Sequence, residues 1–181
     1  PITNAITPYR SVSAATSAAV RRHSFVMALV EDRDGIVWAG TGDGLRRLDP
    51  ATGILTDYEH DGADPASIQP GGIRTLHEAA DGTLWAAGPF GLSRLDEAAT
   101  GRFTRYGMAN GRLPTNTIHG LLEDDGALWL HTDTGILRLD PATGDVHNAE
   151  PHIVGLPIDV SIGAFHRGAS GTLYFGTLNG Y

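Results

Sequence analysis

An aromatic residue recurs along this chain at an almost constant interval, and this interval constrains the fold more than any other feature. Trp38, Trp85, Trp129 and Tyr174 lie 47, 44 and 45 residues apart. A glycine precedes each of them by three positions, and a second glycine follows within seven. A period of this length indicates an array of similar supersecondary units that bury one another's faces.

Each unit contains four short apolar runs separated by turn residues. In the first unit the runs are 26–30, 36–41, 45–48 and 54–58. Asp-Gly pairs separate the first two runs in three units, and this pair favours a tight hairpin because both residues tolerate positive φ. The sequence Asp-Pro-Ala-Thr-Gly at 49–53 recurs unchanged at 140–144 as a further turn. No helical period is sustained through a unit, so we expect four strands and no helices.

The second run is apolar on both faces, as in the segment from Leu84 to Ala87. A sheet with one wet face would alternate, so we expect the units to stack face to face with the tryptophans between them. The predicted fold is all-β, a partial β-propeller of about three and a half four-stranded blades with a repeat of about 45 residues. We assign blades to residues 26–72, 73–117 and 118–161, an incomplete final blade to 162–181, and a lead-in or the remnant of a preceding blade to 1–25.

Composition excludes several classes of function. The 181 residues carry a net charge of −8, and the 13 Lys and Arg residues are scattered, so no nucleic-acid partner is expected. The absence of cysteine excludes thiolate chemistry and cysteine-ligated zinc. Pro1 is not a natural start, and three and a half blades do not close a ring. We therefore expect the natural protein to extend on both sides.

At this point the residues resemble the two-component regulator propeller repeat. The first unit carries the pattern E-D-x-x-G-x-V-W-x-G-T-x-x-G-L-x-R-L-D-P-x-T-G. In the second unit Ala79-Ala80 stands where we align the acid pair Glu31-Asp32, and in the third His131 stands where glycine is usual. The resemblance covers residues 26–181.

The resemblance implies the function. It implies an extracytoplasmic ligand-sensing segment of a transmembrane signalling receptor, in the periplasm of an inner-membrane protein. It also implies the remaining blades, a downstream β-sandwich, a membrane helix, and a histidine kinase or diguanylate cyclase as the output. The partners would be a small-molecule or oligosaccharide ligand and, in the full-length protein, a second copy in a homodimer.

Catalytic and metal-binding patterns are weak in this sequence. The paired carboxylates Glu31-Asp32 and Glu123-Asp124 are adjacent in sequence, so they point to opposite faces and are interpreted as stabilising turns. None of the eight histidines shows a zinc-ligand spacing, and core packing is expected for His77 and His166. We therefore predict no catalytic residue, no metal and no cofactor in this segment.

Candidate binding residues lie where the repeat is broken and where long, variable loops meet one face of the propeller. Rigid scaffolds commonly bind ligands through such loops, although a solvated rim is the simpler alternative. The candidate ligand-binding residues are Arg74, Phe90, Arg112, Asn116, His119, His131, Asp133 and Asn179. Two other functions stay open, a propeller-type polysaccharide lyase or hydrolase and a protein-interaction scaffold.

Overall fold

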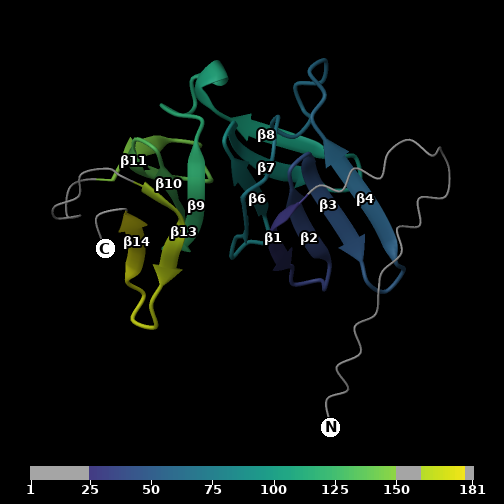
Figure 1. Ribbon diagram of the computed structural model, residues 1–181, viewed down its shortest axis with the longest axis horizontal. Helices are drawn as coiled ribbons and strands as arrows, with labels where there is room; N and C mark the ends of the chain where they lie inside the picture. Colours follow the sequence, from purple (N-terminus) through teal and green to yellow (C-terminus); the bar gives the residue numbers. More distant parts are fainter. Residues whose placement is uncertain (1–24, 150–159, 178–181) are drawn as a thin grey trace, which may run out of the picture.

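The computed structural model describes residues 25–149 and 160–177, which form antiparallel sheets arranged as a fan (Figure 1). In each four-stranded sheet the spatial order of the strands follows the sequence. We number the sheets as blades. Blade 1 consists of β1 (Val26–Glu31), β2 (Val37–Thr41), β3 (Gly44–Asp49) and β4 (Ile54–Glu59).

The other blades repeat this arrangement. Blade 2 consists of β5 (Thr75–Glu78), β6 (Leu84–Gly88), β7 (Gly91–Glu97) and β8 (Arg102–Tyr106). Blade 3 consists of β9 (Ile118–Asp124), β10 (Ala127–Thr132), β11 (Gly135–Leu139) and β12 (Val146–Asn148). Blade 4 is represented by β13 (Val160–Arg167) and β14 (Leu173–Thr177). The predicted fold class, a partial propeller of four-stranded blades, is confirmed.

Side chains fix the turns that the sequence predicted. The Asp32 carboxylate accepts hydrogen bonds from the backbone N–H groups of Asp34 (3.0 Å) and Ile36 (2.9 Å), and Gly35 adopts φ +77°. The same carboxylate accepts the Trp38 indole N–H at 2.7 Å. One aspartate therefore closes the first turn of blade 1 and also satisfies a polar group of the core.

The core lies between the blades rather than within them. Trp38 and Trp85 are almost completely buried, and each packs with apolar residues of the next blade. Tyr58 stacks on Trp38 with ring centroids 5.9 Å apart, meets Phe103 of blade 2 edge-on, and donates its hydroxyl hydrogen bond to the Ala98 carbonyl at 2.8 Å. The prediction that the tryptophans fill the space between stacked blades is confirmed.

In blades 2 and 3 a carboxylate on the first strand holds the first turn of the blade before it. Glu78 of blade 2 accepts the Arg33 backbone N–H at 3.1 Å and its side-chain Nε at 2.8 Å. Glu123 of blade 3 accepts the Ala80 backbone N–H at 2.9 Å and meets His77 Nε2 at 3.0 Å. These bonds join residues 43 to 46 positions apart and fix the stacking distance between neighbouring blades.

Two sequence interpretations need correction. The strand register pairs Glu31 with Val37 and Glu78 with Leu84, so only Asp32 of the acid pair is replaced in blade 2, by Ala79. His77 and His166 do not fill the core. His77 is half-buried against Glu123, and His166 is exposed. His77 faces the gap between blades 2 and 3, where its side chain reaches a partner on the next sheet.

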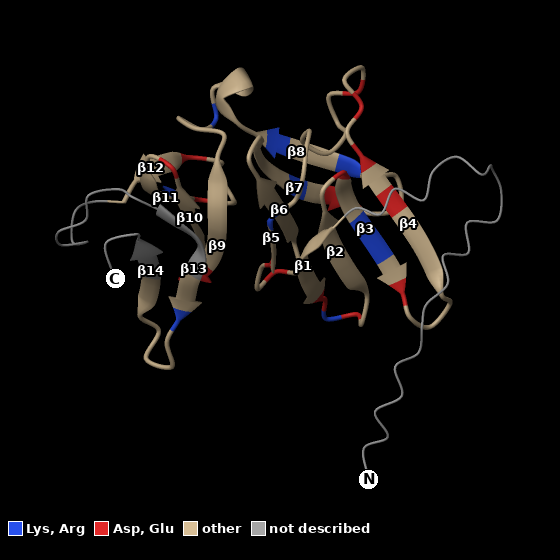
Figure 2. Cartoon of the chain, viewed as in Figure 1, with Lys and Arg blue, Asp and Glu red and all other residues tan. Residues whose placement is uncertain are grey.

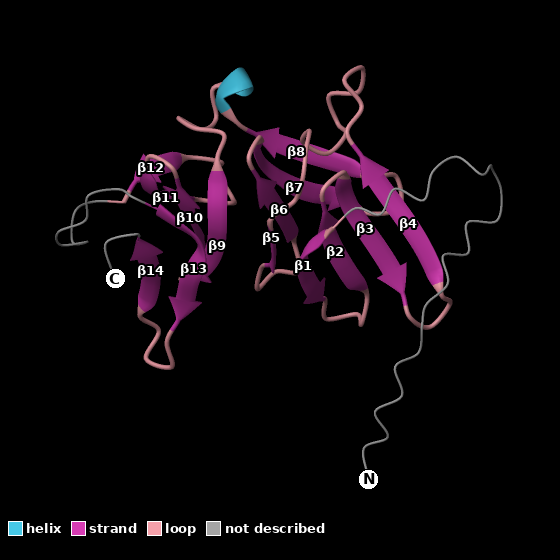
Figure 3. Cartoon of the chain, in the orientation of Figure 1, coloured by secondary structure: helices cyan, strands magenta, loops and turns pink. Residues whose placement is uncertain are grey.

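One short 3₁₀ turn, η1 (Met108–Asn110), interrupts the β structure, whereas we expected no helix (Figure 3). Asn110 Oδ1 accepts the Gly107 N–H at 3.1 Å, which closes this turn locally. In the described part of the chain no helix has the length and apolar character needed to cross a membrane. Figure 2 shows the basic residues dispersed over separate strands and turns, in keeping with the scattered charges of the sequence.

Candidate ligand site on the inner strands

Three unlike side chains hold the same repeat position at the start of the first strand in blades 1, 2 and 3. The β1–β2 register slips between Val26 and Ala28, and the β9–β10 register slips in the same way around His119. Met27 and His119 are therefore bulge residues. In blade 2 Arg74 holds this position, and its N–H bonds to the Ala87 carbonyl at 2.8 Å. Bulges re-aim a side chain, and in blades 1 and 3 they turn one variable residue out of the regular alternation.

His131 lies beside this row, on β10, and is 2% exposed. Its counterpart in blade 1 is Gly40, where a Cβ atom would lie 2.6 Å from the Ile73 carbonyl oxygen, so blade 1 has no room for a side chain. Blade 3 places a large side chain at this position. The register partner of His131 is Gly120, where a Cβ would collide with the Phe165 ring, whereas the equivalent pair of blade 1 is Ala28 and Gly40. An imidazole has thus entered the layer between blades, opposite a residue without a side chain.

The two histidines form one cluster. The rings of His119 and His131 meet edge-on with centroids 5.9 Å apart. Burial, with a smaller contribution from the nearby His119, lowers the pKa of His131 to about 4. Burial also lowers the pKa of His119, as does the charge of Arg74, while the Asp133 carboxylate raises it. Both imidazoles are therefore neutral at pH 7, and the charges of Arg74 and Asp133 both act on His119.

Asp133 occupies the tip between β10 and β11 and is exposed, but its orientation is fixed. The Thr115 hydroxyl donates a hydrogen bond to Asp133 Oδ1 at 2.5 Å, and the Thr117 N–H donates to the Thr115 hydroxyl at 3.2 Å. Sequence reasoning missed Thr115, because a threonine 18 positions from its partner in a loop carries no pattern. The loop between blades 2 and 3 thus supports the aspartate that approaches the histidine pair.

The remaining predicted residues lie elsewhere. Phe90 is 54% exposed, and its ring lies over Gly71, where an added Cβ would meet it at 2.6 Å. The Arg112 guanidinium stacks over the Tyr106 ring at 4.9 Å. Asn116 Oδ1 accepts the Met108 N–H at 2.8 Å and braces its own loop. Asn179 lies outside the described residues.

The structure thus brings together four of the eight predicted residues. They are Arg74, His119, His131 and Asp133, which we call the inner-strand cluster. The cluster spans blades 2 and 3 and offers a fixed cation, two neutral imidazoles and a carboxylate. Such a set binds polar ligands that present both acceptors and donors. Within residues 25–149 and 160–177, no three His, Asp or Glu side chains gather in a way that could hold a metal ion.

The fold and the site define the class of this chain, a β-propeller segment whose inner strands carry variable polar residues. The family described as two component regulator propeller matches residues 21–43. Residues 21–43 therefore match the two-component regulator propeller repeat that the sequence resembles. No curated protein matches the chain.

Solved structures share the fold at low sequence identity. The extracellular domain assigned to a hybrid two component system of B. thetaiotaomicron aligns with a TM-score of 0.63 and 18% identity, over 84% of this chain and 27% of that one. Virginiamycin B lyase from Staphylococcus aureus aligns with a TM-score of 0.62 and 20% identity, over 86% of this chain and 53% of that one. A streptogramin B lyase aligns with a TM-score of 0.60 and 21% identity. The chain thus spans a quarter to a half of these proteins, and the likeness shows the fold.

Proposed function

We propose that this chain is part of the ligand-sensing propeller of a transmembrane signalling receptor and that the inner-strand cluster binds the ligand. The observation that carries this proposal is the substitution of scaffold positions by polar residues at one place. His131 of blade 3 stands where blades 1 and 2 have Gly40 and Ala87. At the neighbouring position the three blades have Met27, Arg74 and His119, while the surrounding turns keep the repeat. The repeat describes the scaffold, so such departures indicate a binding role.

The energetics of His131 support this reading. A buried neutral imidazole is held at a pKa far below its usual range, and a glycine or alanine serves the same position in the other blades. Burial disfavours the protonated form of this imidazole, so the substitution costs stability at acidic pH, where a glycine or alanine would cost nothing.

The placement of the cluster couples binding to blade packing. Arg74 belongs to blade 2, whereas His119, His131 and Asp133 belong to blade 3. A ligand that contacts both blades favours one relative arrangement of the two sheets. Binding energy that differs between two arrangements shifts their populations, which is how a propeller can transmit a signal.

A thermal-shift screen tests the proposal. The 181-residue chain is melted in the presence of a panel of neutral and acidic oligosaccharides and small sugar acids. We expect at least one compound to raise the melting temperature in a saturable way, and we expect Arg74→Ala and His119→Ala to remove that shift.

Matched controls lie on the outer strands. Arg102 on β8 and His147 on β12 are exposed, so Arg102→Ala and His147→Ala should keep the shift. A panel that produces no shift, or a shift that survives loss of both Arg74 and His119, would contradict the proposed site.

The proposal extends to the rest of the receptor. We expect further blades, a β-sandwich, a membrane helix and a kinase or cyclase output in the same gene, with this segment in the periplasm and the receptor as a homodimer. The repeat and the likeness to an extracellular domain of a two component system support this arrangement. Reading 300 further codons of the gene tests it, and a continuation without a membrane helix would argue against a receptor.

A propeller lyase or hydrolase is the second candidate. The observation that favours it is the neutral histidine pair, since an unprotonated imidazole can accept a proton as a general base. Incubating the chain with the same oligosaccharides and measuring new reducing ends and unsaturated products distinguishes the two functions. A sensor gives binding without turnover, whereas an enzyme gives products that His119→Ala abolishes.

A further inference from the structure

The arginine of the inner-strand cluster has no counter-charge in the described part of the chain. Arg74 is half-buried just before β5, and no described carboxylate lies within ion-pairing distance of it. Four other arginines each pair with a carboxylate at 2.8 Å, namely Arg33, Arg46, Arg94 and Arg167. Charged groups that lose water are normally paired. In a chain of net charge −8, an unpaired half-buried cation indicates a local site for an anion.

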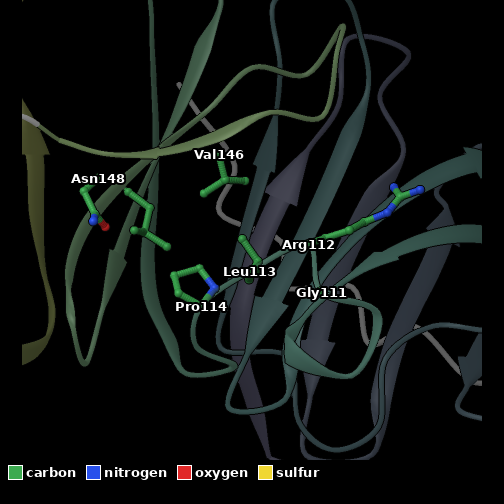
Figure 4. Close-up of a pocket in the computed structure, with 7 residues that line it drawn as sticks. Gly111, Arg112, Leu113, Pro114, Val146 and Asn148 are labelled. Atoms are coloured by element: carbon green, nitrogen blue, oxygen red, sulfur yellow. The ribbon is translucent and has the colours of Figure 1, made fainter.

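Arg112, the other arginine among the predicted binding residues, needs no such partner. Figure 4 shows it reaching away from the cavity beside Leu113 and Pro114. Its guanidinium stacks over the Tyr106 ring at 4.9 Å, and an aromatic face attracts a cation. Among the described residues no aromatic ring holds the Arg74 guanidinium in this way.

His119 supplies the second half of the anion site. It holds in blade 3 the repeat position that Arg74 holds in blade 2, and the Arg74 charge acts on its imidazole. The His119 Nδ1 atom is buried and has no hydrogen-bond partner among the described residues. Buried polar atoms usually have a partner. One carboxylate bound between the two side chains would neutralise Arg74 and satisfy this nitrogen.

Asp133 restricts the charge of the ligand and adds a second contact. Its carboxylate also acts on His119, and its Oδ1 accepts the Thr115 hydroxyl at 2.5 Å. A doubly charged phosphate would be repelled by this carboxylate, whereas the single charge of a carboxylic acid is balanced by Arg74. The second oxygen of Asp133 is an acceptor and matches a hydroxyl donor. The cluster therefore fits a carboxylate that has a hydroxyl group nearby.

We propose that the inner-strand cluster binds a hydroxy acid and takes up a proton when it does so. The ligand carboxylate pairs with Arg74 and accepts a hydrogen bond from His119, while the ligand hydroxyl donates to Asp133. The inference rests on the proposed function and names the chemical class of its ligand.

The proton goes to His119. Burial and the Arg74 charge lower its pKa, and the Asp133 carboxylate raises it, so the imidazole is neutral at pH 7 in the free chain. The described neighbours add no other charge, because His131 stays neutral and the ring of Phe165 packs on β9 from blade 4. A bound carboxylate offsets the Arg74 charge and favours the imidazolium form. The pKa therefore rises on binding, and the affinity increases as the pH falls.

Calorimetric titration with matched ligands tests the proposal. The 181-residue chain is titrated with D-gluconate and D-galacturonate, and with their neutral counterparts D-glucitol and D-galactose, at one ionic strength. We expect at least one acid to bind about tenfold more tightly than its counterpart, or more. Buffers of different ionisation enthalpy should reveal proton uptake. The affinity should rise by up to about tenfold per pH unit from about pH 8 to about pH 6.

Four variants separate the roles of the side chains. Arg74→Gln should lower the affinity for the acid at least about tenfold. His119→Asn should bind the acid without proton uptake and with an affinity that no longer depends on pH in this range. Arg102→Gln and His147→Asn make the same changes at exposed positions of outer strands and should bind like the natural chain. Melting curves of each variant establish that it is folded.

The other outcomes overturn the proposal in distinguishable ways. If neither acid binds but a neutral compound does, and Arg74→Gln and His119→Asn remove that binding, the site stands and the hydroxy acid is wrong. If the acid binds equally at every pH, or if His119→Asn still takes up a proton, the assignment of the proton to His119 is wrong. If no compound of the thermal-shift panel binds, the proposed function fails together with this inference.

Discussion

Single residues in this molecule take roles that depend on the blade in which the repeat places them. Trp38 donates its indole N–H to Asp32, whereas Trp85 meets Ala79 at the corresponding place and has no partner for its indole N–H among the described residues. Gly40 is small because Ile73 touches it, whereas His131 is large and buried. The same backbone position thus serves packing in one blade and chemistry in another.

The buried imidazole of His131 makes stability depend on pH. Its pKa in the folded chain, about 4, is below the value of about 6.5 in an unfolded chain, so the unfolded state binds the proton more readily. The free energy of unfolding is therefore highest above about pH 6.5. It falls by an amount on the order of 3 kcal/mol as the pH falls towards 4. Urea unfolding at several pH values measures this loss. His131→Ala should lose less free energy of unfolding over this pH range. An equal pH dependence of unfolding in both proteins would contradict the lowered pKa of His131.

The orphaned indole of Trp85 predicts a stabilising substitution. Ala79→Asp places a carboxylate where Asp32 stands in blade 1, near the Arg33 guanidinium that already donates to the Ala79 carbonyl at 3.0 Å. A hydrogen bond to a charged acceptor should raise the free energy of unfolding by about 1 kcal/mol. Ala80→Asp adds the same charge at an exposed position without reaching the indole and serves as the control. A variant at position 79 that is no more stable than its control would refute the prediction.

Strands of neighbouring blades are joined mainly by side chains, because hydrogen-bonded ladders exist only within each sheet. Glu78 and Glu123 bridge blades 1 to 2 and 2 to 3, and Arg167 with Asp124 bridges blades 3 to 4 at 2.8 Å with the charges exchanged. Glu31 holds the same position in blade 1 and is exposed. The first strand of every blade therefore carries a charged residue suited to hold the turn of a preceding sheet.

The bridge at Glu78 should contribute more than an ion pair within one blade. Glu78→Gln weakens two hydrogen bonds to Arg33, and the Glu78 side chain is only 15% exposed. We expect it to lower the free energy of unfolding by about 1 kcal/mol. Asp57→Asn removes the charge from the more exposed pair with Arg46 on β3 and should change stability by less. If chemical denaturation gave equal losses of the free energy of unfolding for both variants, the bridge between blades would contribute no more than an ion pair within one blade.

At the scale of the whole molecule, no described residue covers the face of β1 that points away from blade 2. Phe25 and Leu29 are 85% and 68% exposed, whereas Leu121, the counterpart of Leu29 in blade 3, is 2% exposed beneath its neighbour. With Glu31 at its end, this face has the same apolar and acidic pattern that blades 2 and 3 bury. The arrangement fits a propeller in which another blade stacks on β1.

We expect the 181-residue chain to self-associate through this face. Leu29→Lys should shift the sedimentation profile towards the monomer, because a charge opposes burial of the apolar strand. Ile54→Lys, at an exposed apolar position on the outer strand β4, should leave association unchanged. A natural chain that sediments as a stable, monodisperse monomer would contradict both this expectation and the open face from which it follows.

The sequence was sufficient to predict the features that depend on a few neighbouring residues and recur in each blade. The period of the aromatic residues, the Asp-Gly and Asp-Pro-Ala-Thr-Gly turns and the doubly apolar second strand predicted four-stranded blades with buried tryptophans. It also selected Arg74, His119, His131 and Asp133 among eight candidates. It could not separate them from Arg112 and Asn116, which the structure shows engaged with Tyr106 and Met108.

The amino-acid sequence by itself determined the blades, because turn geometry and strand alternation depend on neighbours a few residues apart. Only the tertiary structure decided which side chains meet between blades. The bulge that aims His119 and the carboxylates that cross to the preceding turn both depend on register and stacking. Those are set by packing between residues about 45 positions apart, and no local pattern encodes such contacts.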